Sequence, residues 1–240
     1  MLTPHVAAGP EIEFPEMVPG RVATQVARIV VARDDAPDKG VPPRSSAELR
    51  ASADPQVLAE AAAVFEPGSV EVVGYATTTS AYAIGGDAES AMVDRLARRL
   101  GLPVTATCLS AVRALRVLDV DRVTLVHPPW FDDELNELGA SYFRAHGFTV
   151  VASALADLPN DPSRIEADAV VDWVANNFND AAGAVFIGGN GFRAAGAIGA
   201  LEKMLGRPVL ESNQVLLWSM LNEAGAAPDV HGYGRLLARQ

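Results

Sequence analysis

The sequence has a single cysteine, Cys108, among its 240 residues. This excludes a disulfide bond within the chain and a structural zinc site built from several thiolates. Basic residues are also few: 19 Lys and Arg stand against 30 Asp and Glu, which gives a net charge of −11. Since phosphate binding depends on basic patches, nucleic acid is not expected to be a partner.

Long apolar runs are missing too. No stretch approaches the roughly 18–20 apolar residues that would span a bilayer, and residues 1–5 do not form a basic segment ahead of an apolar one. We therefore expect a soluble cytoplasmic protein without a membrane partner. Cofactor signatures are absent as well: no Gly-x-Gly-x-x-Gly motif follows the first strand, no phosphate-binding P-loop occurs, and no His/Glu spacing suggests a metal. We expect no cofactor and no metal.

Apolar material is ample, with 49% hydrophobic residues and a mean hydropathy of +0.15, as in globular proteins. Short apolar, β-branched runs without alternation indicate parallel strands that are buried on both faces. These runs are Val26–Val31, Val70–Tyr75, Pro103–Thr107, Arg122–Val126, Phe148–Val151, Ala184–Ile187 and Pro208–Leu210. Amphipathic segments between them predict helices at Ala47–Val64, Glu89–Leu100, Ala111–Leu118, Asp133–His146, Arg164–Phe178 and Ala194–Leu205. Asp87 and Asp161 are the expected N-caps of two of these helices. The alternation is typical of an α/β fold with parallel sheets flanked by helices.

A short internal repeat indicates two similar halves. Residues 99–104 (RLGLPV) resemble residues 204–209 (MLGRPV), and each copy ends a helix, turns at Gly and starts a strand with Pro. A small-residue loop lies upstream of each copy. We predict an N-terminal half at residues 1–110, a C-terminal half at 111–220, and a tail at 221–240 that packs back on the fold. Only one or two residues precede the loop that begins at Thr3, so we expect the first strand to be a weak edge or the start site to lie downstream of the native one.

Ligands of parallel sheets bind at the carboxyl ends of the strands. The loops predicted there are Thr3–Gly9, Arg33–Asp35, Ala76–Ser80, Cys108–Ser110, His127–Phe131, Gly188–Arg193 and Glu211–Gln214. Ala76–Ser80 carries four consecutive hydroxyls, and Gly188–Gly191 allows the backbone to approach a ligand closely. Together they favour a site for a small anion such as a carboxylate. An unliganded helix cap and a plain tight turn are the alternatives.

Candidate acid–base groups also lie at the predicted strand ends. His5 and His127 are placed to move a proton, although His127 could equally be a hydrogen-bonded side chain in a rigid Pro-rich turn. Cys108 fits a small buried hydrophobe better than a nucleophile. Arg193 could pair with a carboxylate, or it could be an exposed arginine at a helix start.

The sequence resembles the aspartate/glutamate racemase superfamily in four features. These are the two halves, the hydroxyl loop after Val70–Tyr75, the Gly-rich loop and the tail Gly232-Tyr233-Gly234-Arg235-Leu236. Within it they resemble the branch of maleate cis–trans isomerase and arylmalonate decarboxylase. The resemblance implies cofactor-independent chemistry beside a carboxylate, in an active cleft between two pseudo-symmetric α/β halves. It also implies a homo-oligomer, a dimer being plausible. We expect Trp173 and Phe178 either to form an interface or to be buried within the subunit.

Residues can be carried over from that branch. Its catalytic cysteines would fall at Ala76 or Thr77 and at Gly189 or Asn190, where this sequence has none. Thr77 and Thr78 match a hydroxyl pair that stabilises an enediolate in the decarboxylase. The remaining expected contacts to substrate are Thr79, Gly189, Asn190, Gly191 and Arg193, and the proton carrier is expected among His5, Tyr75 and His127.

The sequence thus predicts an isomerase or decarboxylase that acts on a small carboxylic or dicarboxylic acid, with a hydroxyl and backbone anion hole and a proton carrier other than cysteine. The alternative is a catalytically inactive carboxylate-binding protein of the same fold. A flavodoxin-like nucleotide binder is disfavoured, since no phosphate fingerprint occurs.

Overall fold

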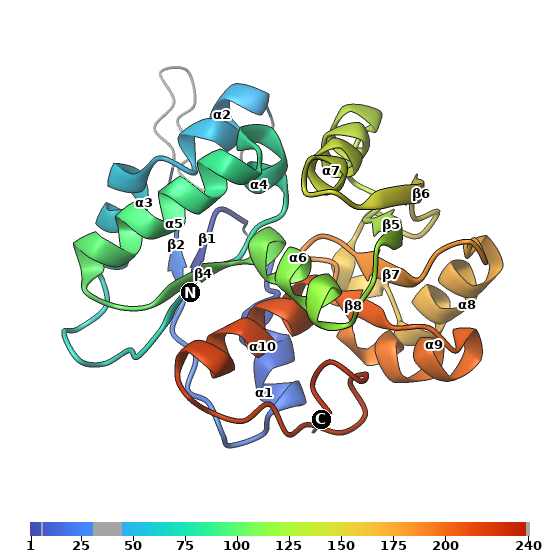
Figure 1. Ribbon diagram of the computed structural model, residues 1–240. Coiled ribbons are helices and arrows are strands. Elements are labelled where there is room, and N and C mark those ends of the chain that lie inside the picture. Colours follow the sequence, from blue (N-terminus) through green and yellow to red (C-terminus); the bar gives the residue numbers. More distant parts are fainter. Residues whose placement is uncertain (6, 31–44, 239–240) are drawn as a thin grey trace.

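The computed structural model describes residues 1–5, 7–30 and 45–238 (Figure 1). The predicted loop Arg33–Asp35 and the last residue of the predicted strand Val26–Val31 lie outside these ranges.

The first half of the chain builds a parallel sheet whose strands follow the order β2-β1-β3-β4 in the described residues. Its strands are β1 (Leu2–Thr3), β2 (Ala27–Arg28), β3 (Val73–Tyr75) and β4 (Val104–Ala106). β1 pairs with β2 on one side and with β3 on the other. The prediction of a weak edge at β1 is therefore wrong: the strand is short but lies inside the sheet, and Leu2 is fully buried.

The second half repeats this arrangement with the order β6-β5-β7-β8, again parallel. Its strands are β5 (Arg122–His127), β6 (Thr149–Leu155), β7 (Ala184–Ile187) and β8 (Val209–Glu211). In both sheets the first strand of the half lies between the second and the third. Two α/β halves with parallel sheets are thereby confirmed. The exact bounds at 110 and 220 stay a prediction.

Helices flank both sheets and lie between them (Figure 1). They are α1 (Pro10–Met17), α2 (Ser46–Ala51), α3 (Pro55–Ala62), α4 (Thr79–Ile84), α5 (Gly86–Leu100), α6 (Thr107–Val117), α7 (Asp133–Ala145), α8 (Ala167–Asn177), α9 (Ile198–Leu205) and α10 (Ser212–Glu223). Two short 3₁₀ helices, η1 (Pro162–Arg164) and η2 (Ala195–Ala197), precede α8 and α9.

The predicted helix Ala47–Val64 is in fact two helices. Asp54 caps α3, since its Oδ1 accepts the N–H of Gln56 at 2.7 Å, and Pro55 occupies the first turn. Asp87 is not an N-cap, because α5 begins one residue earlier and Gly85 stands at that position. Asp161 does act as a cap, but of η1 rather than of the longer predicted helix. Gly101 and Gly206 end their helices in the left-handed conformation, with φ of 66° and 65°.

The two halves share a core. α10 packs against α6 and reaches β4 of the first sheet, while α1 packs against α10. Trp173 and Phe178 are half-buried against this core, so an interface and burial within the subunit both stay predictions. The tail also packs on the fold: Leu236 and Leu237 are buried, and the side-chain amide of Gln214 donates to Tyr233 O at 2.7 Å.

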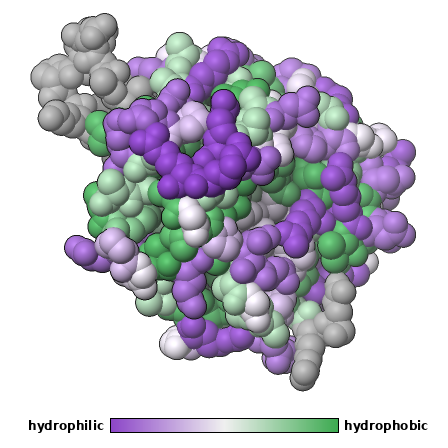
Figure 2. Space-filling view, turned by 60° about the vertical axis from the view of Figure 1, so that its left-hand side comes forward, coloured by the Kyte–Doolittle hydropathy of each residue, from purple (hydrophilic) through white to green (hydrophobic). Residues whose placement is uncertain are grey.

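The face in Figure 2 mixes hydrophilic and apolar residues, as water-exposed surfaces commonly do. In the described ranges, no helix is both long and apolar enough to cross a bilayer.

Candidate active site

A cavity of about 540 Å³ lies at the carboxyl ends of strands from both sheets. The first half contributes the loop after β1 and the start of α4, and the second half contributes the loops after β5 and β7. The predicted cleft between the halves is thus present. Its lining residues are His5, Ala7, Leu49, Thr79, Trp130, Phe131, Asp132, Leu135, Asn160, Pro162, Gly189, Asn190 and Gly191.

Glycines let the loops of the two halves touch. A Cβ on Gly9 would lie 2.1 Å from the backbone oxygen of Asn190, so any side chain there would push the loops apart. A Cβ added to Gly191 would lie 3.4 Å from the Cβ of Ala7, which is close contact. The loop after β1 and the loop after β7 therefore form one continuous wall of the cavity.

His5 lies in this wall, and its Nε2 is buried without a hydrogen-bond partner among the described residues. Burial and the nearby positive charge of Arg28 lower the pKa of His5 to about 4, against the opposing effect of Glu11. The imidazole is therefore neutral at pH 7. A buried ring nitrogen without a partner inside a cavity is suited to bind or exchange a proton with a ligand.

The three predicted threonines have different roles. Only Thr79 lines the cavity, and its hydroxyl lies 3.2 Å from the hydroxyl of Thr77. Thr77 is fully buried behind Thr79 and also accepts the N–H of Ser80 at 3.5 Å. Thr78 is fully buried and its hydroxyl has no partner among the described residues. A ligand in this cavity therefore meets Thr79 first, with Thr77 as its support.

The Gly189–Gly191 loop also lines the cavity, and Gly189 has a φ of 92° that favours glycine. The side chain of Asn190, however, is 1% exposed and points into the protein. Its Nδ2 donates to Asn213 Oδ1 at 2.8 Å and to Thr107 Oγ1 at 3.2 Å. Asn190 therefore ties its loop to the protein interior and offers the cavity backbone rather than a free amide.

Arg193 does not line the cavity. Its Nη2 donates to Pro162 O at 2.7 Å, while its buried Nε has no partner among the described residues. The residue has a φ of 57°, an uncommon conformation for a non-glycine residue. Since Pro162 lines the cavity, Arg193 fixes part of the wall rather than reaching a ligand directly.

His127 and Tyr75 are both directed away from the cavity. The Nδ1 of His127 is 2.9 Å from Asn136 Oδ1, its Nε2 is 3.2 Å from Tyr82 Oη, and burial lowers its pKa to about 4. The alternative of a hydrogen-bonded His in a turn fits these contacts. Tyr75 is buried in the core of the first half and donates to Ser52 O at 3.1 Å. Of the three proposed proton carriers, the structure brings only His5 to the cavity.

Cys108 is fully buried and does not line the cavity. Burial, reinforced by the nearby charge of Glu89, raises the pKa of its thiol well above the usual range. Its Sγ lies 3.8 Å from the carbonyl oxygen of Thr78. The thiol is therefore uncharged at neutral pH and belongs to the core, as expected of a small buried hydrophobe.

The sequence did not point to the apolar side of the cavity. Trp130 is 37% exposed at its edge, with its ring 5.8 Å from that of Phe192, and Phe131 lies beside it in the lining. Leu49, Leu135 and Pro162 complete the apolar lining. A recognisable signal was available, since residues 128–131 (PPWF) directly follow a strand. The cavity therefore offers a hydrophobic surface beside His5, Thr79 and the glycine loop.

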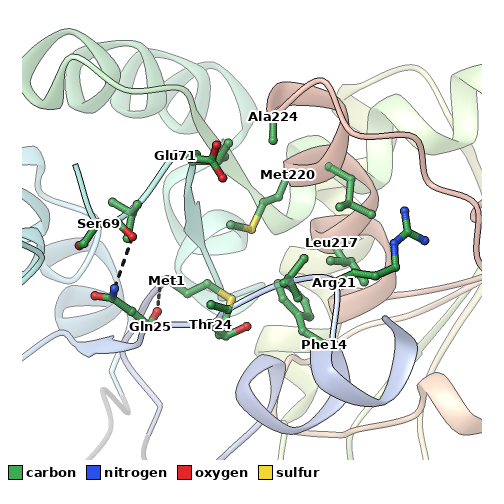
Figure 3. A pocket seen from close by; sticks show the side chains of 15 residues that line it. Met1, Phe14, Arg21, Thr24, Gln25, Ser69, Glu71, Leu217, Met220 and Ala224 are labelled. Carbon is green, nitrogen blue, oxygen red and sulfur yellow. Dashed lines mark hydrogen bonds between the residues drawn. The ribbon is translucent and has the colours of Figure 1, made fainter. Parts of the chain in front are cut away.

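A second cavity, of about 220 Å³, lies at the other edge of the first sheet (Figure 3). Met1 and residues 70–72, which precede β1 and β3, line it together with residues 21–25, Phe14 of α1, and Leu217, Met220 and Leu221 of α10. Figure 3 shows Gln25 bonded to both Met1 and Ser69 at its rim. This second cavity lies at the amino ends of the strands. Ligands of parallel sheets bind at the carboxyl ends, so the first cavity is the candidate site. Among the described residues, no cluster of His, Cys, Asp and Glu could hold a metal.

Two similar α/β halves enclose one cavity at their strand ends, and this fold is shared with the structures of arylmalonate decarboxylase and maleate isomerase. A family model described as arylmalonate decarboxylase matches residues 51–237, and the chain belongs to that family.

Individual relatives agree with this assignment. Arylmalonate decarboxylase from Bordetella bronchiseptica is 25% identical over 170 residues, which cover 69% of this chain and 70% of that protein. Maleate isomerase Iso from Pseudomonas putida S16 has a similar structure, with 20% identity, a TM-score of 0.80 and coverage of 99% and 96% of the two chains. A mutant maleate cis–trans isomerase from Nocardia farcinica, with a covalently bound succinylcysteine intermediate, is also similar in structure. It has 21% identity and a TM-score of 0.78, and the match covers 100% of this chain and 97% of that one. The predicted resemblance to this branch is confirmed.

Proposed function

We propose that the cavity binds a small carboxylic or dicarboxylic acid and that the protein catalyses a cofactor-independent isomerisation or decarboxylation beside the carboxylate. The observation that carries this proposal is His5: its Nε2 is buried and unpartnered among the described residues, in a cavity wall shared with Thr79 and Gly189–Gly191. These groups supply a proton carrier, a hydroxyl donor and a close backbone approach at one place.

The electrostatics of His5 suit an anionic ligand. In the free protein the ring is neutral because burial lowers its pKa to about 4. A carboxylate placed beside it favours the charged form and raises that pKa, so binding draws a proton onto the ring. In a decarboxylation, the bond between the α-carbon and one carboxylate breaks and CO₂ leaves. The electron pair of that bond passes to the remaining carboxylate as an enediolate, and His5 then gives its proton to the α-carbon. The Thr79 hydroxyl and the loop backbone stabilise the enediolate formed between these steps.

The apolar lining agrees with a substrate that has a carbon substituent as well as a carboxylate. Trp130, Phe131, Leu49 and Leu135 present a hydrophobic surface on which such a group can pack. The proposal carries with it the expectations of a homo-oligomer and a cytoplasmic location, with no nucleic acid or membrane partner. Analytical ultracentrifugation of the purified protein tests the first of these.

The test is proton NMR in deuterated water with a panel of maleate, α-substituted malonates, aspartate and glutamate. We expect conversion or deuterium uptake with at least one of them, and loss of either in His5→Gln. Thr79→Val serves as the second variant, because it removes the hydroxyl but keeps the shape of the side chain. Equal turnover in all three proteins would refute the assignment.

An inactive carboxylate-binding protein remains the second candidate. One structural relative carries a covalently bound succinylcysteine intermediate, whereas the only cysteine here is Cys108, buried in the core. In the same NMR experiment, ligand lines that broaden without conversion or deuterium uptake would support this candidate.

A further inference from the structure

Behind the glycine loop lies a buried cluster of two carboxyl groups and two amides. Glu13 of α1 is 2% exposed and Glu211 at the start of α10 is fully buried. Asn213 lies between them, and Asn190 lies next to Asn213. The cluster joins elements that are far apart in the sequence: Glu13 is separated from Ala195 by 182 positions and from Asn213 by 200.

The carboxylate of Glu13 holds the loop at two points. Its Oε1 accepts the N–H of Ala195 at 2.8 Å, at the start of η2, which follows the loop after residues 192–194. Its Oε2 accepts a hydrogen bond from Asn213 Nδ2, which also donates to Asn190 O at 2.9 Å. Asn190 Nδ2 in turn donates to Asn213 Oδ1 at 2.8 Å. One side chain of the first half thus fixes the middle and the end of a loop in the second half.

We propose that Glu13 is a positioning residue of the cavity: its carboxylate, through Ala195 and Asn213, sets the place of the Gly189–Gly191 wall. That Glu13 positions the wall for a substrate rests on the proposed function. That Glu13 holds the Gly189–Gly191 loop in place does not depend on it.

The chemistry of the cluster makes the charge on Glu13 important. Both of its oxygens accept from N–H donors, so a carboxylate fits the site, whereas Gln at this position turns an NH₂ group toward one of those donors. Four groups act electrostatically with Glu13: Glu16, Arg193, Glu211 and Tyr233. Burial raises the pKa of Glu13 to about 7. Burial together with the charge of Glu13 raises the pKa of Glu211 well above the ordinary value, so Glu211 is the neutral member of the pair.

Glu211 offers a matched control. It is as buried as Glu13, but its Oε2 accepts the N–H groups of Asn213 and Gln214, at 2.8 and 3.0 Å, and caps α10. Among the described residues it makes no hydrogen bond to the Gly189–Gly191 loop. Gln is a close mimic of a neutral Glu that keeps the accepting oxygen. The pair Glu13→Gln and Glu211→Gln therefore separates a hold on the loop from a general effect of altering the buried cluster.

The experiment follows the backbone amide of Ala195 and the side-chain amide of Asn213 by ¹H–¹⁵N NMR between pH 5.5 and 8.5. In the wild-type protein both signals are expected to titrate together with a midpoint near 7. The titration should persist in Glu211→Gln and vanish in Glu13→Gln. Wild-type signals that do not titrate, or a titration that survives in Glu13→Gln, would overturn the proposal. The wild-type titration decides the matter even where Glu13→Gln does not fold.

Binding of malonate, added as a probe, tests the positioning role. Glu13→Gln should weaken malonate binding on the order of tenfold, since small displacements of a binding wall are costly, and Glu211→Gln should leave it unchanged. Equal affinity in Glu13→Gln and the wild type would overturn that role. If the wild-type protein does not bind malonate or any acid of the panel, the proposed function fails, and the amide titration still decides whether Glu13 holds the loop.

Discussion

Tyr82 and His127 meet across the boundary between the two halves. The Tyr82 hydroxyl lies 3.2 Å from His127 Nε2, and the two rings are 5.5 Å apart at an interplanar angle of 77°. Glycines make room for this pair, because a Cβ on Gly139 or Gly188 would lie within 3.0 Å of His127. The other nitrogen of the ring is held by Asn136. His127 is therefore a structural link between the halves.

Replacing Tyr82 with Phe tests that role. The change leaves His127 Nε2 buried without its partner, which should lower the free energy of unfolding by about 1–3 kcal/mol. Since neither residue lines the cavity, carboxylate affinity should stay the same. Urea denaturation and ligand titration of the purified variant give the two values. A fall in affinity without a loss of stability would instead place His127 in the reaction.

Thr78→Val and Thr79→Val should change different properties of the protein: the first its stability, the second its binding or turnover of a carboxylate. The Thr78 hydroxyl is buried without a partner among the described residues, so a methyl group in its place should leave the fold equally stable or more so. Thr79 lines the cavity, so loss of its hydroxyl should weaken carboxylate binding or turnover. Thermal unfolding and the NMR assay measure both effects. If Thr78→Val abolished turnover and Thr79→Val did not, the hydroxyl that acts on the substrate would be Thr78.

Much of the fold could be predicted because parallel strands buried on both faces leave short, unbroken apolar runs, such as Ala184–Ile187. Some helices left no such pattern. α10 is buried on nearly every side, so its sequence lacks an amphipathic period, and α1 contains Pro15. α4 is short and begins within the loop Ala76–Ser80, where hydroxyl residues conceal it.

In the candidate site, too, some features could be predicted from the sequence and others could not. The rule that ligands bind at strand ends depends only on the order of strands and helices, and the predicted loops after β1, β5 and β7 do line the cavity, as does Thr79. The predicted loops Cys108–Ser110 and Glu211–Gln214 do not line it, since they lie at the starts of α6 and α10. The directions of the side chains could not be predicted. Asn190 points inward because Thr107 and Asn213, distant in the sequence, hold its amide. Tyr75 points into the first core because Ser52 accepts its hydroxyl there.

Binding of an anion should depend on pH through His5. Its pKa is about 4 in the free protein and rises when an anion lies beside it, so the complex takes up a proton. Affinity should therefore increase as pH falls from 7 toward 5, and the gain should end near pH 4, where the free protein is already protonated. Ethanesulfonate is a suitable probe because it stays ionised throughout. Calorimetric titration should show a larger gain in affinity toward low pH in the wild type than in His5→Gln, because the titration of Glu13 near pH 7 is common to both proteins; parallel profiles would exclude His5 as the group that takes up the proton.

Glu89 makes a separate prediction about stability. Its side chain is fully buried, accepts a hydrogen bond from the Tyr142 hydroxyl, and has a pKa raised by burial from 4.5 to about 7. The folded state thus favours the protonated form. Its stabilising contribution is complete below the unfolded pKa and is lost as pH rises from 4.5 through 7. A rise of the pKa from 4.5 to about 7 corresponds to roughly 3 kcal/mol of unfolding free energy.

Glu89→Gln keeps an accepting oxygen for Tyr142 but cannot ionise, so its stability should not contain this slope. Subtracting its unfolding free energy from that of the wild type at each pH between 4.5 and 7.5 isolates the contribution of Glu89. Glu137→Gln is the control: Arg144 and Ser141 lower the pKa of this exposed carboxyl, so its linkage fades just above the unfolded value of 4.5 and leaves the rest of the window, up to pH 7.5, flat. The difference in unfolding free energy between the wild type and Glu89→Gln could also stay constant with pH. Glu89 would then have one charge state across this range, and its contact with Tyr142 between the two halves would be independent of pH.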